Sequence, residues 1–476
     1  MFLPRFLLLS LCIILGTIAT LTPIDNLHFY RAPRFHGFNT SCVWSGDQLY
    51  ETRNWKTVLD VSYASGSASK SWNLCGETSP LLNINGSGNM LTLLTNVQAL
   101  PSPSNFVHIL TKEINPSLQA GSFGHLSFNG KFSIDEGYID LRQNLAAGFF
   151  IHVNLPIRNL TIKNICFEDC SPATGPFSMQ TPAWKRFKNN FDAVLADYNI
   201  KPLGVTFSHT DIGDLCILAG WEQIDEKKTD IAASLGGNLQ LGILFPTSKT
   251  ASALYAFALP TGYNGHWGIP LHASIMWGVT SWLRWSFRGG ALFFFDTTRT
   301  MRVKTNLNQS GPIKLAQGSI KEHLGTHWYL GTDLQFYHFF KGFSLIIGYS
   351  FNRAEKSTLS SETCCGIITC SGCGDSSSCS ACPPIIPTAS TTCCDPCLQV
   401  TSTVNAFNNC IINGDTALCP WQMQVLHFLL DYDFSVHMKR KHWAPRLKFF
   451  YDLPVDGKHV FDTDMIGGGV GIDIRW

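Results

Sequence analysis

Alternation of apolar and polar residues along most of the chain is the sequence feature that most restricts its fold. In one such stretch Leu426, Phe428 and Leu430 share one face, and the residues between them belong to the other. Twelve comparable stretches can be counted between residues 59 and 476. Successive side chains of a strand point to opposite faces, so each stretch predicts a strand with one apolar face. The pattern therefore predicts an antiparallel all-β protein.

The connections between these stretches alternate strictly between short and long. Short connections are predicted at 142–147, 224–230, 280–282, 338–342 and 435–444, and long loops at about 68–130, 157–210, 296–325 and 353–423. A soluble β-sandwich has no reason to separate short from long connections in this way, whereas transmembrane barrels have short periplasmic turns and longer outer loops. We expect a transmembrane antiparallel up-and-down β-barrel of about 12 strands, with long extracellular loops.

The N-terminal segment and the composition agree with an exported protein. Residues 1–19 carry one positive charge, at Arg5, followed by an apolar run, which predicts a signal peptide and leaves residues 20–476 as the barrel. Charged residues make up only 14% of the chain, with 35 Lys and Arg against 34 Asp and Glu. A balanced, weakly charged surface makes nucleic acid an unexpected partner. The uncharged segment 250–283 is interrupted by Pro260, Gly262 and Pro270, so it does not predict a spanning helix.

The last stretch places apolar residues alternately up to the final position. These residues, the expected assembly signal, are Val470, Ile472, Ile474 and Trp476. The stretch resembles the C-terminal targeting strand of Gram-negative, porin-like outer-membrane β-barrels, in which Phe is the usual last residue and Trp is tolerated. The resemblance implies a location in the bacterial outer membrane, with membrane lipid and the barrel-assembly machinery as partners.

Charged residues occupy the positions opposite the apolar stripes, where they are expected to face the lumen. The predicted lumen charges are Arg284, Arg288, Asp333, Asp431, Asp433, Arg446, Lys448, Asp452, Asp473 and Arg475. Five acids thus face five bases. Opposite charges on neighbouring strands stabilise one another, each pair contributing roughly 0.2–1 kcal/mol. The charges either stabilise the wall or line a water-filled channel with little preference for cations or anions.

The longest loop is rich in cysteine, with 11 of the 17 cysteines of the chain. The disulfide candidates are Cys364, Cys365, Cys370, Cys373, Cys379, Cys382, Cys393, Cys394, Cys397, Cys410 and Cys419. Three C-x2-C spacings are also compatible with zinc, but export favours disulfides. Because eleven is odd, at least one of these cysteines is free, bonds to a cysteine elsewhere in the chain (Cys42, Cys75, Cys166 or Cys170), or joins another molecule. In the last case a homo-oligomer or a disulfide-linked neighbour is a candidate partner. Dense surface cysteines are similar to those of chlamydial major outer-membrane barrels, although no motif matches.

Apart from these cysteine spacings, no local motif indicates an enzyme, a metal site or a cofactor. The chain lacks a Gly-x-Ser-x-Gly elbow, a His-Glu-x-x-His motif and a phosphate-binding glycine loop. We therefore expect no catalytic activity and no cofactor, although a Ser/His site assembled from separate strands stays open. The expected function is a porin-like channel for passive diffusion of small polar solutes or ions. The alternative is a structural or adhesive envelope protein that displays a disulfide-linked, cysteine-rich loop.

One loop segment has apolar residues at helical spacing, including Trp184, Phe187, Phe191 and Leu195. This stripe predicts a helix that packs its loop onto the barrel. A plug or a partner-binding helix is the alternative.

Overall fold

Each of the twelve alternating stretches forms a strand in the computed structural model, and the strands close into one barrel. The structure describes residues 55–89, 124–171, 182–225, 234–304, 309, 311–314, 316–361, 412–437 and 443–475. The barrel strands are β1 (Lys56–Ala68), β5 (His125–Asn144), β6 (Phe149–Asp169), β8 (Leu215–Asp225), β9 (Ser234–Phe245), β10 (Gly268–Gly278), β11 (Leu283–Phe294), β14 (His327–Phe340), β15 (Phe343–Ala354), β17 (Trp421–Asp433), β18 (Trp443–Lys458) and β20 (Asp464–Arg475). The predicted signal peptide lies outside the described residues.

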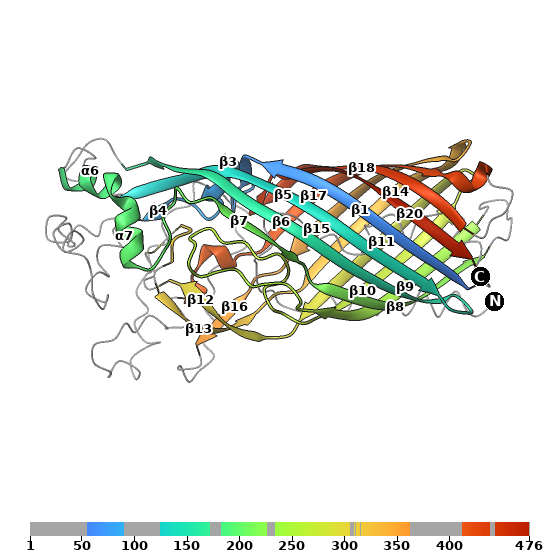
Figure 1. Ribbon diagram of the computed structural model, residues 1–476, viewed down its shortest axis with the longest axis horizontal. Helices are drawn as coiled ribbons and strands as arrows, with labels where there is room; N and C mark the ends of the chain where they lie inside the picture. Colours follow the sequence, from blue (N-terminus) through green and yellow to red (C-terminus); the bar gives the residue numbers. More distant parts are fainter. Residues whose placement is uncertain are drawn as a thin grey trace.

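Closure follows from pairing between the first and last strands. All neighbouring strands are antiparallel, and β1 is hydrogen-bonded to β20 on one side and to β5 on the other. The pairing of β5 with β6 completes the ring. Lys56 is opposite Arg475, so β1 begins where β20 ends, at the end of the barrel with the short turns (Figure 1). The expected closed barrel of about twelve strands is confirmed.

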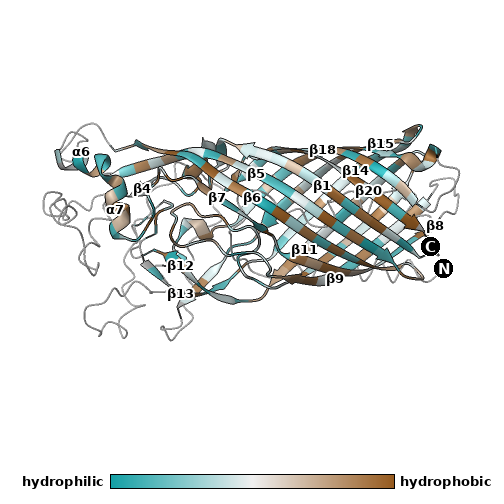
Figure 2. Cartoon of the chain, viewed as in Figure 1, coloured by the Kyte–Doolittle hydropathy of each residue, from teal (hydrophilic) through white to brown (hydrophobic). Residues whose placement is uncertain are grey.

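The outer face of the barrel is a band of exposed apolar side chains. Leu241, Leu330 and Phe449 are each more than half exposed although they are fully apolar, and Figure 2 shows the band around the barrel end that carries the short turns. Large aromatic residues stand exposed at the strand ends, for example Trp282 at the short turns and Trp267 near the loops. An apolar band with aromatic residues at both margins is typical of barrels that span a membrane.

Shorter elements cover the end that carries the long loops. A three-stranded sheet contains β12 (Thr297–Val303), β13 (Ala316–His323) and β16 (Thr358–Ser361), and a second contains β2 (Lys70–Trp72), β3 (Thr78–Pro80) and β19 (Val460–Phe461). β4 (Gly88–Asn89) and β7 (Phe207–Ile212) extend the pairing of β5 and β6. The short helical turns are η2 (Leu81–Asn83), η4 (Thr416–Leu418) and η5 (Phe434–His437). All four predicted long loops, 68–130, 157–210, 296–325 and 353–423, therefore contain strand residues.

The β5–β6 hairpin is longer than the sequence pattern predicted. β6 continues to Asp169, so the first part of the segment expected to be a loop over 157–210 is strand. In the sequence KFSIDEGYIDLR, residues 131–142, the apolar positions change face midway, which predicts a bulge near Glu136 and Gly137. This prediction is wrong, because the β1–β5 register is continuous there and the shift in the β5–β6 register falls between Asn129 and Lys131. The even-numbered residues of β5 from 132 to 144 all face inward, and only their chemistry changes, from apolar to polar.

Two short helices pack against the projecting part of this hairpin. α6 (Pro182–Asn189) and α7 (Phe191–Asp197) bury Trp184, Phe187 and Phe191 in the main apolar cluster of the protein, which also includes inner-face residues of β5 and β6. The rings of Trp184 and Phe187 are stacked, with centroids 5.0 Å apart. The helical stripe therefore packs the loop onto the barrel, as its spacing predicted. Neither of these helices, nor any other in the described part of the chain, is long and apolar enough to cross a membrane.

Candidate functional site

The interior of the barrel has two halves of opposite chemistry. Toward the short turns, the inner-face residues are charged or polar, as at Asp140 on β5 and Lys448 on β18. Toward the loops, they are apolar, as at Leu218 on β8 and Leu292 on β11, which belong to one buried cluster. Successive side chains of a strand point to opposite faces, so every second residue along each strand faces inward. These inward-facing residues line both halves.

The structure places nine of the ten predicted lumen charges on the inner face of the polar half. They are Arg284, Arg288, Asp333, Asp431, Asp433, Arg446, Lys448, Asp452 and Asp473. Arg288 Nη2 lies 2.7 Å from Asp333 Oδ1, and Arg446 lies 3.3, 3.7 and 4.0 Å from three carboxylates of β17 and β20. The guanidinium of Arg284 stacks over the ring of Tyr337, 4.3 Å from its centroid. The side chain of Arg475 lies outside the described residues.

Seven further charged residues share this interior, although the sequence pattern did not single them out. They are Lys56, Asp60, Glu136, Asp140, Arg142, Arg158 and Glu222. Lys56 pairs with Asp473 at 3.0 Å, Arg142 with Glu222 at 3.1 Å and Arg158 with Glu136 at 2.9 Å. The described interior therefore holds nine acids and seven bases instead of five of each. Three of them, Glu136, Asp140 and Arg142, lie on β5, where the change from apolar to polar residues midway along the inner face obscured their alternation. The other four lie on β1, β6 and β8.

The charged side chains of the polar half are packed against one another. Arg284, Lys56 and Asp473 are each 1% exposed or less, and Arg446 is 5% exposed. Side chains this deeply buried fill the space near them instead of lining an open bore. Buried charges are retained only when they are paired, because an unpaired charge in such surroundings is costly.

A segment of the chain between β9 and β10 folds into the loop-side half of the barrel. In this in-folded segment, residues 246–267, the side chains of Thr261, Asn264 and His266 are fully buried. Tyr263 joins the apolar cluster formed by inner-face residues of β8, β9, β11 and β14. Arg158 Nη1 on β6 donates a hydrogen bond of 2.6 Å to the Thr261 carbonyl. The predicted uncharged stretch 250–283 thus supplies most of a segment that packs against inner-face residues in the outer half of the barrel.

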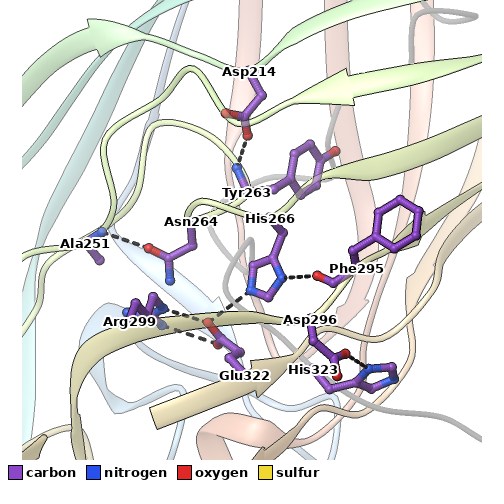
Figure 3. A network of polar contacts seen from close by, with 10 residues as sticks. All are labelled: Asp214, Ala251, Tyr263, Asn264, His266, Phe295, Asp296, Arg299, Glu322 and His323. Atoms are coloured by element: carbon purple, nitrogen blue, oxygen red, sulfur yellow. Dashed lines mark hydrogen bonds and ion pairs between the residues drawn. The ribbon is translucent and has the colours of Figure 1, made fainter. Parts of the chain in front are cut away.

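Polar contacts hold the in-folded segment to the surrounding elements (Figure 3). The Asp214 carboxylate, just before β8, accepts hydrogen bonds from the backbone N–H groups of Tyr263 and Ser248. His266 Nδ1 lies 2.8 Å from the Phe295 carbonyl oxygen, and its Nε2 lies 3.2 Å from the Glu322 carboxylate on β13. The segment is therefore connected to both the barrel wall and the outer β12–β13–β16 sheet.

Glu322 is the central acid of these contacts. It is fully buried and also accepts hydrogen bonds from Arg299 on β12, at 2.6 and 3.3 Å. Burial alone would raise the pKa of Glu322, but the charges and hydrogen bonds of Arg299 and His266 lower the pKa to about 2. Glu322 therefore stays ionised and holds its partners at ordinary pH.

The remaining predicted site residues lie at the barrel seam and in the cysteine-rich loop. Val470, Ile472 and Ile474 lie on β20 beside β1, with Val470 59% exposed on the outer face. Trp476 and ten of the eleven candidate cysteines are outside the described residues; Cys419, the eleventh, is buried just before β17. The disulfide framework, its zinc alternative and the assembly signal remain predictions. Among the described residues, no group of His, Cys, Asp or Glu is arranged to hold a metal ion.

Comparison with known proteins gives weak likenesses only. No family model and no curated protein matches the chain. Among solved structures, an outer membrane channel from Pseudomonas putida F1 is similar, with a TM-score of 0.42 and 9% identity over 89% of this chain and 96% of that chain. The translocator domain of the autotransporter NalP from Neisseria meningitidis has a TM-score of 0.31 and 10% identity, over 90% of this chain and 92% of that chain. The Pseudomonas putida toluene transporter TodX has a TM-score of 0.30 and 10% identity, over 96% of this chain and 100% of that chain.

At these TM-scores the likenesses carry no argument about function, and the architecture rests on the strand pairing itself. A ring of twelve antiparallel strands leaves no open sheet edge in the membrane, and its apolar side chains face outward while its charges face inward. These are the features of a bacterial outer-membrane β-barrel.

Proposed function

We propose that the protein is an outer-membrane channel for small polar solutes or ions, with its path through the polar half of the barrel. The observation that carries this proposal is the segregation of chemistry across the wall. Sixteen ionisable acids and bases face inward, on strands whose outward positions are exposed and apolar. A wall that only had to be stable could use apolar packing inside, because replacing buried ion pairs by apolar residues is often neutral or stabilising.

The path proposed here is closed at rest. The buried charges narrow its inner half, and the in-folded segment 246–267 obstructs its outer half. Conduction then requires this segment to move away from Asp214 and Arg158, which hold its backbone. A neutral Asp214→Asn substitution weakens that attachment and is expected to raise the fraction of time in which the channel is open.

Conductance of purified protein in a planar lipid bilayer tests the proposal. The interior has two more acids than bases, so we expect the wild-type channel to favour cations slightly. Changing Arg446 and Lys448 together to Gln should strengthen this preference, since both bases lie within the polar half. The shift should weaken as salt is raised, because the Debye length falls from about 10 Å at 0.1 M to about 3 Å at 1 M.

A matched control removes the same charge from outside the barrel. Lys185 and Arg186 are exposed on α6, and changing both to Gln should leave the ion preference as it is in the wild type. Equal shifts in the two double variants would show that the lumen charges do not govern conduction.

The close packing of the interior favours a second candidate, a structural or adhesive envelope protein that displays the cysteine-rich loop. This candidate predicts that folded wild-type protein and the Asp214→Asn variant are both silent in the bilayer. In that case the double change at Arg446 and Lys448 should lower thermal stability without producing any current.

A further inference from the structure

A Ser, a His and an Asp on three consecutive barrel strands form one hydrogen-bonded chain in the polar half. Ser350 Oγ on β15 lies 2.7 Å from His427 Nε2 on β17. His427 Nδ1 lies 2.8 Å from Asp452 Oδ1 on β18. His427 is directly opposite Asp452 in the β17–β18 register and is one diagonal step from Ser350 in the β15–β17 register. The antiparallel pairing therefore fixes all three on the inner face.

The contacts define which atom carries each proton. An ionised Asp452 carboxylate can only accept, so it favours the His427 tautomer with a proton on Nδ1. His427 Nε2 is then an acceptor, and the Ser350 hydroxyl donates to it. Asn352 Nδ2, also on β15, donates to Ser350 Oγ at 3.0 Å. A serine hydroxyl that donates to a histidine, itself oriented by an aspartate, is the arrangement that activates serine as a nucleophile.

The surroundings of His427 leave it more accessible than the ion pairs of the polar half. The side chains of His427 and Asp452 are 18% and 14% exposed, whereas Lys56 and Asp473 are fully buried. Gly348 is the residue directly opposite His427 on β15, so no side chain from that position covers the imidazole. Ser350 itself is buried, so an acyl group must approach from the His427 side and displace the Asn352 amide from Oγ.

We propose that Ser350, His427 and Asp452 form a nucleophilic serine site that hydrolyses small carboxylic esters entering the lumen. Ser350 Oγ bonds to the acyl carbon as its proton passes to His427 Nε2. The ester C–O bond then breaks, and the alcohol leaves with that proton. Water repeats the sequence on the acyl-serine, losing a proton to His427, and releases the carboxylic acid and the free serine. This activity is separate from conduction and needs no cofactor.

Covalent labelling of the folded full-length protein by a fluorophosphonate tests the site, with peptide mass spectrometry to find the modified residue. We expect the label on Ser350 and its loss in Ser350→Ala. His427→Gln removes the base and should slow labelling at least about 100-fold. Hydrolysis of p-nitrophenyl acetate should fall in parallel. Ser344→Ala is the matched control, because Ser344 is a buried serine on the same face of β15, and it should label as the wild type does.

Asp452→Asn separates catalysis from folding, since the amide keeps the size of the carboxylate. It should preserve heat-modifiable, folded protein and still slow labelling by at least about 100-fold. Failure of folded wild-type protein to label Ser350, or labelling that is unchanged in His427→Gln and Asp452→Asn, would overturn the proposal and leave the three residues as a structural hydrogen-bond chain. Neither result depends on whether the protein conducts in a bilayer.

Discussion

At the scale of single residues, the pairing of Lys448 with Asp60 shows how the interior tolerates charge. The two side chains, from β18 and β1, form a buried ion pair in which each is almost fully shielded from solvent. Strands β18 and β1 are not neighbours, because β20 lies between them. The pair therefore reaches across a third strand. β20 contains four glycines, of which Gly467, Gly469 and Gly471 face inward. A Cβ at Gly471 would lie only 2.7 Å from Asp60 Oδ2, so the glycine there leaves room for the pair.

Removing one partner of this pair should lower the free energy of unfolding more than removing both. Asp60→Asn leaves the Lys448 ammonium buried without its carboxylate, and we expect a loss of about 3–5 kcal/mol in the free energy of unfolding. The double variant Asp60→Asn with Lys448→Met should recover much of that loss. Urea unfolding of the refolded barrel, monitored by tryptophan fluorescence, measures both. Additive losses in the double variant would show that the two residues do not stabilise each other.

At the scale of elements, the attachment of the in-folded segment should depend on pH through Glu322. The pKa of Glu322 is about 2 in the folded protein, below its ordinary value of 4.5. The stabilising contribution is therefore complete above pH 4.5 and is lost as the pH falls from 4.5 to 2. The hydrogen-exchange protection of residues 246–267, that is the intrinsic exchange rate at each pH divided by the observed rate, should fall over that range. In Glu322→Gln the protection should already be low at neutral pH and should change little with acid.

Strand positions were predictable from sequence because alternation is a local property, but the elements outside the membrane were not. β5 keeps one set of residues inward along its length, yet Phe132 and Ile134 are apolar where the hairpin projects, while Glu136 and Asp140 are polar inside the band. The sequence pattern alone could not separate this change of surroundings from a change of face. The in-folded segment has no periodic signal, because its position depends on contacts to Asp214 and Glu322, far away in sequence.

Dependence on contacts between residues far apart in sequence also explains why the Ser-His-Asp chain and several lumen charges were missed. Ser350, His427 and Asp452 lie 77 and 25 residues apart along the chain, and only the β15–β17–β18 register brings them together. The lumen charges were predictable individually from their alternation. Their number and their pairing across non-adjacent strands were not.

At the scale of the whole molecule, the alternation of short turns and long loops predicts which parts of the chain face the outside. A protease site or an epitope tag introduced within 365–415 should be accessible on intact cells, because β16, the last described element before this loop, pairs with β13 at the end of the barrel that carries the long loops. The same insertion within 225–229, in the connection from β8 to β9, should be accessible only after the outer membrane is permeabilised. Surface labelling at 225–229 on intact cells would reverse the orientation.

The length of the β5–β6 hairpin determines which part of the protein an approaching molecule meets first. β6 has 21 residues, which at roughly 3.3 Å each and a strand tilt of about 40° gives a rise of roughly 50 Å, twice the apolar band of about 25 Å. An antibody or a bacteriophage approaching the cell therefore meets α6 and α7 before it meets the rim of the barrel. Exposed residues of those helices, such as Lys185, contact neither lipid nor lumen. We therefore expect substitutions at these positions to alter recognition by an antibody or a bacteriophage without altering membrane insertion.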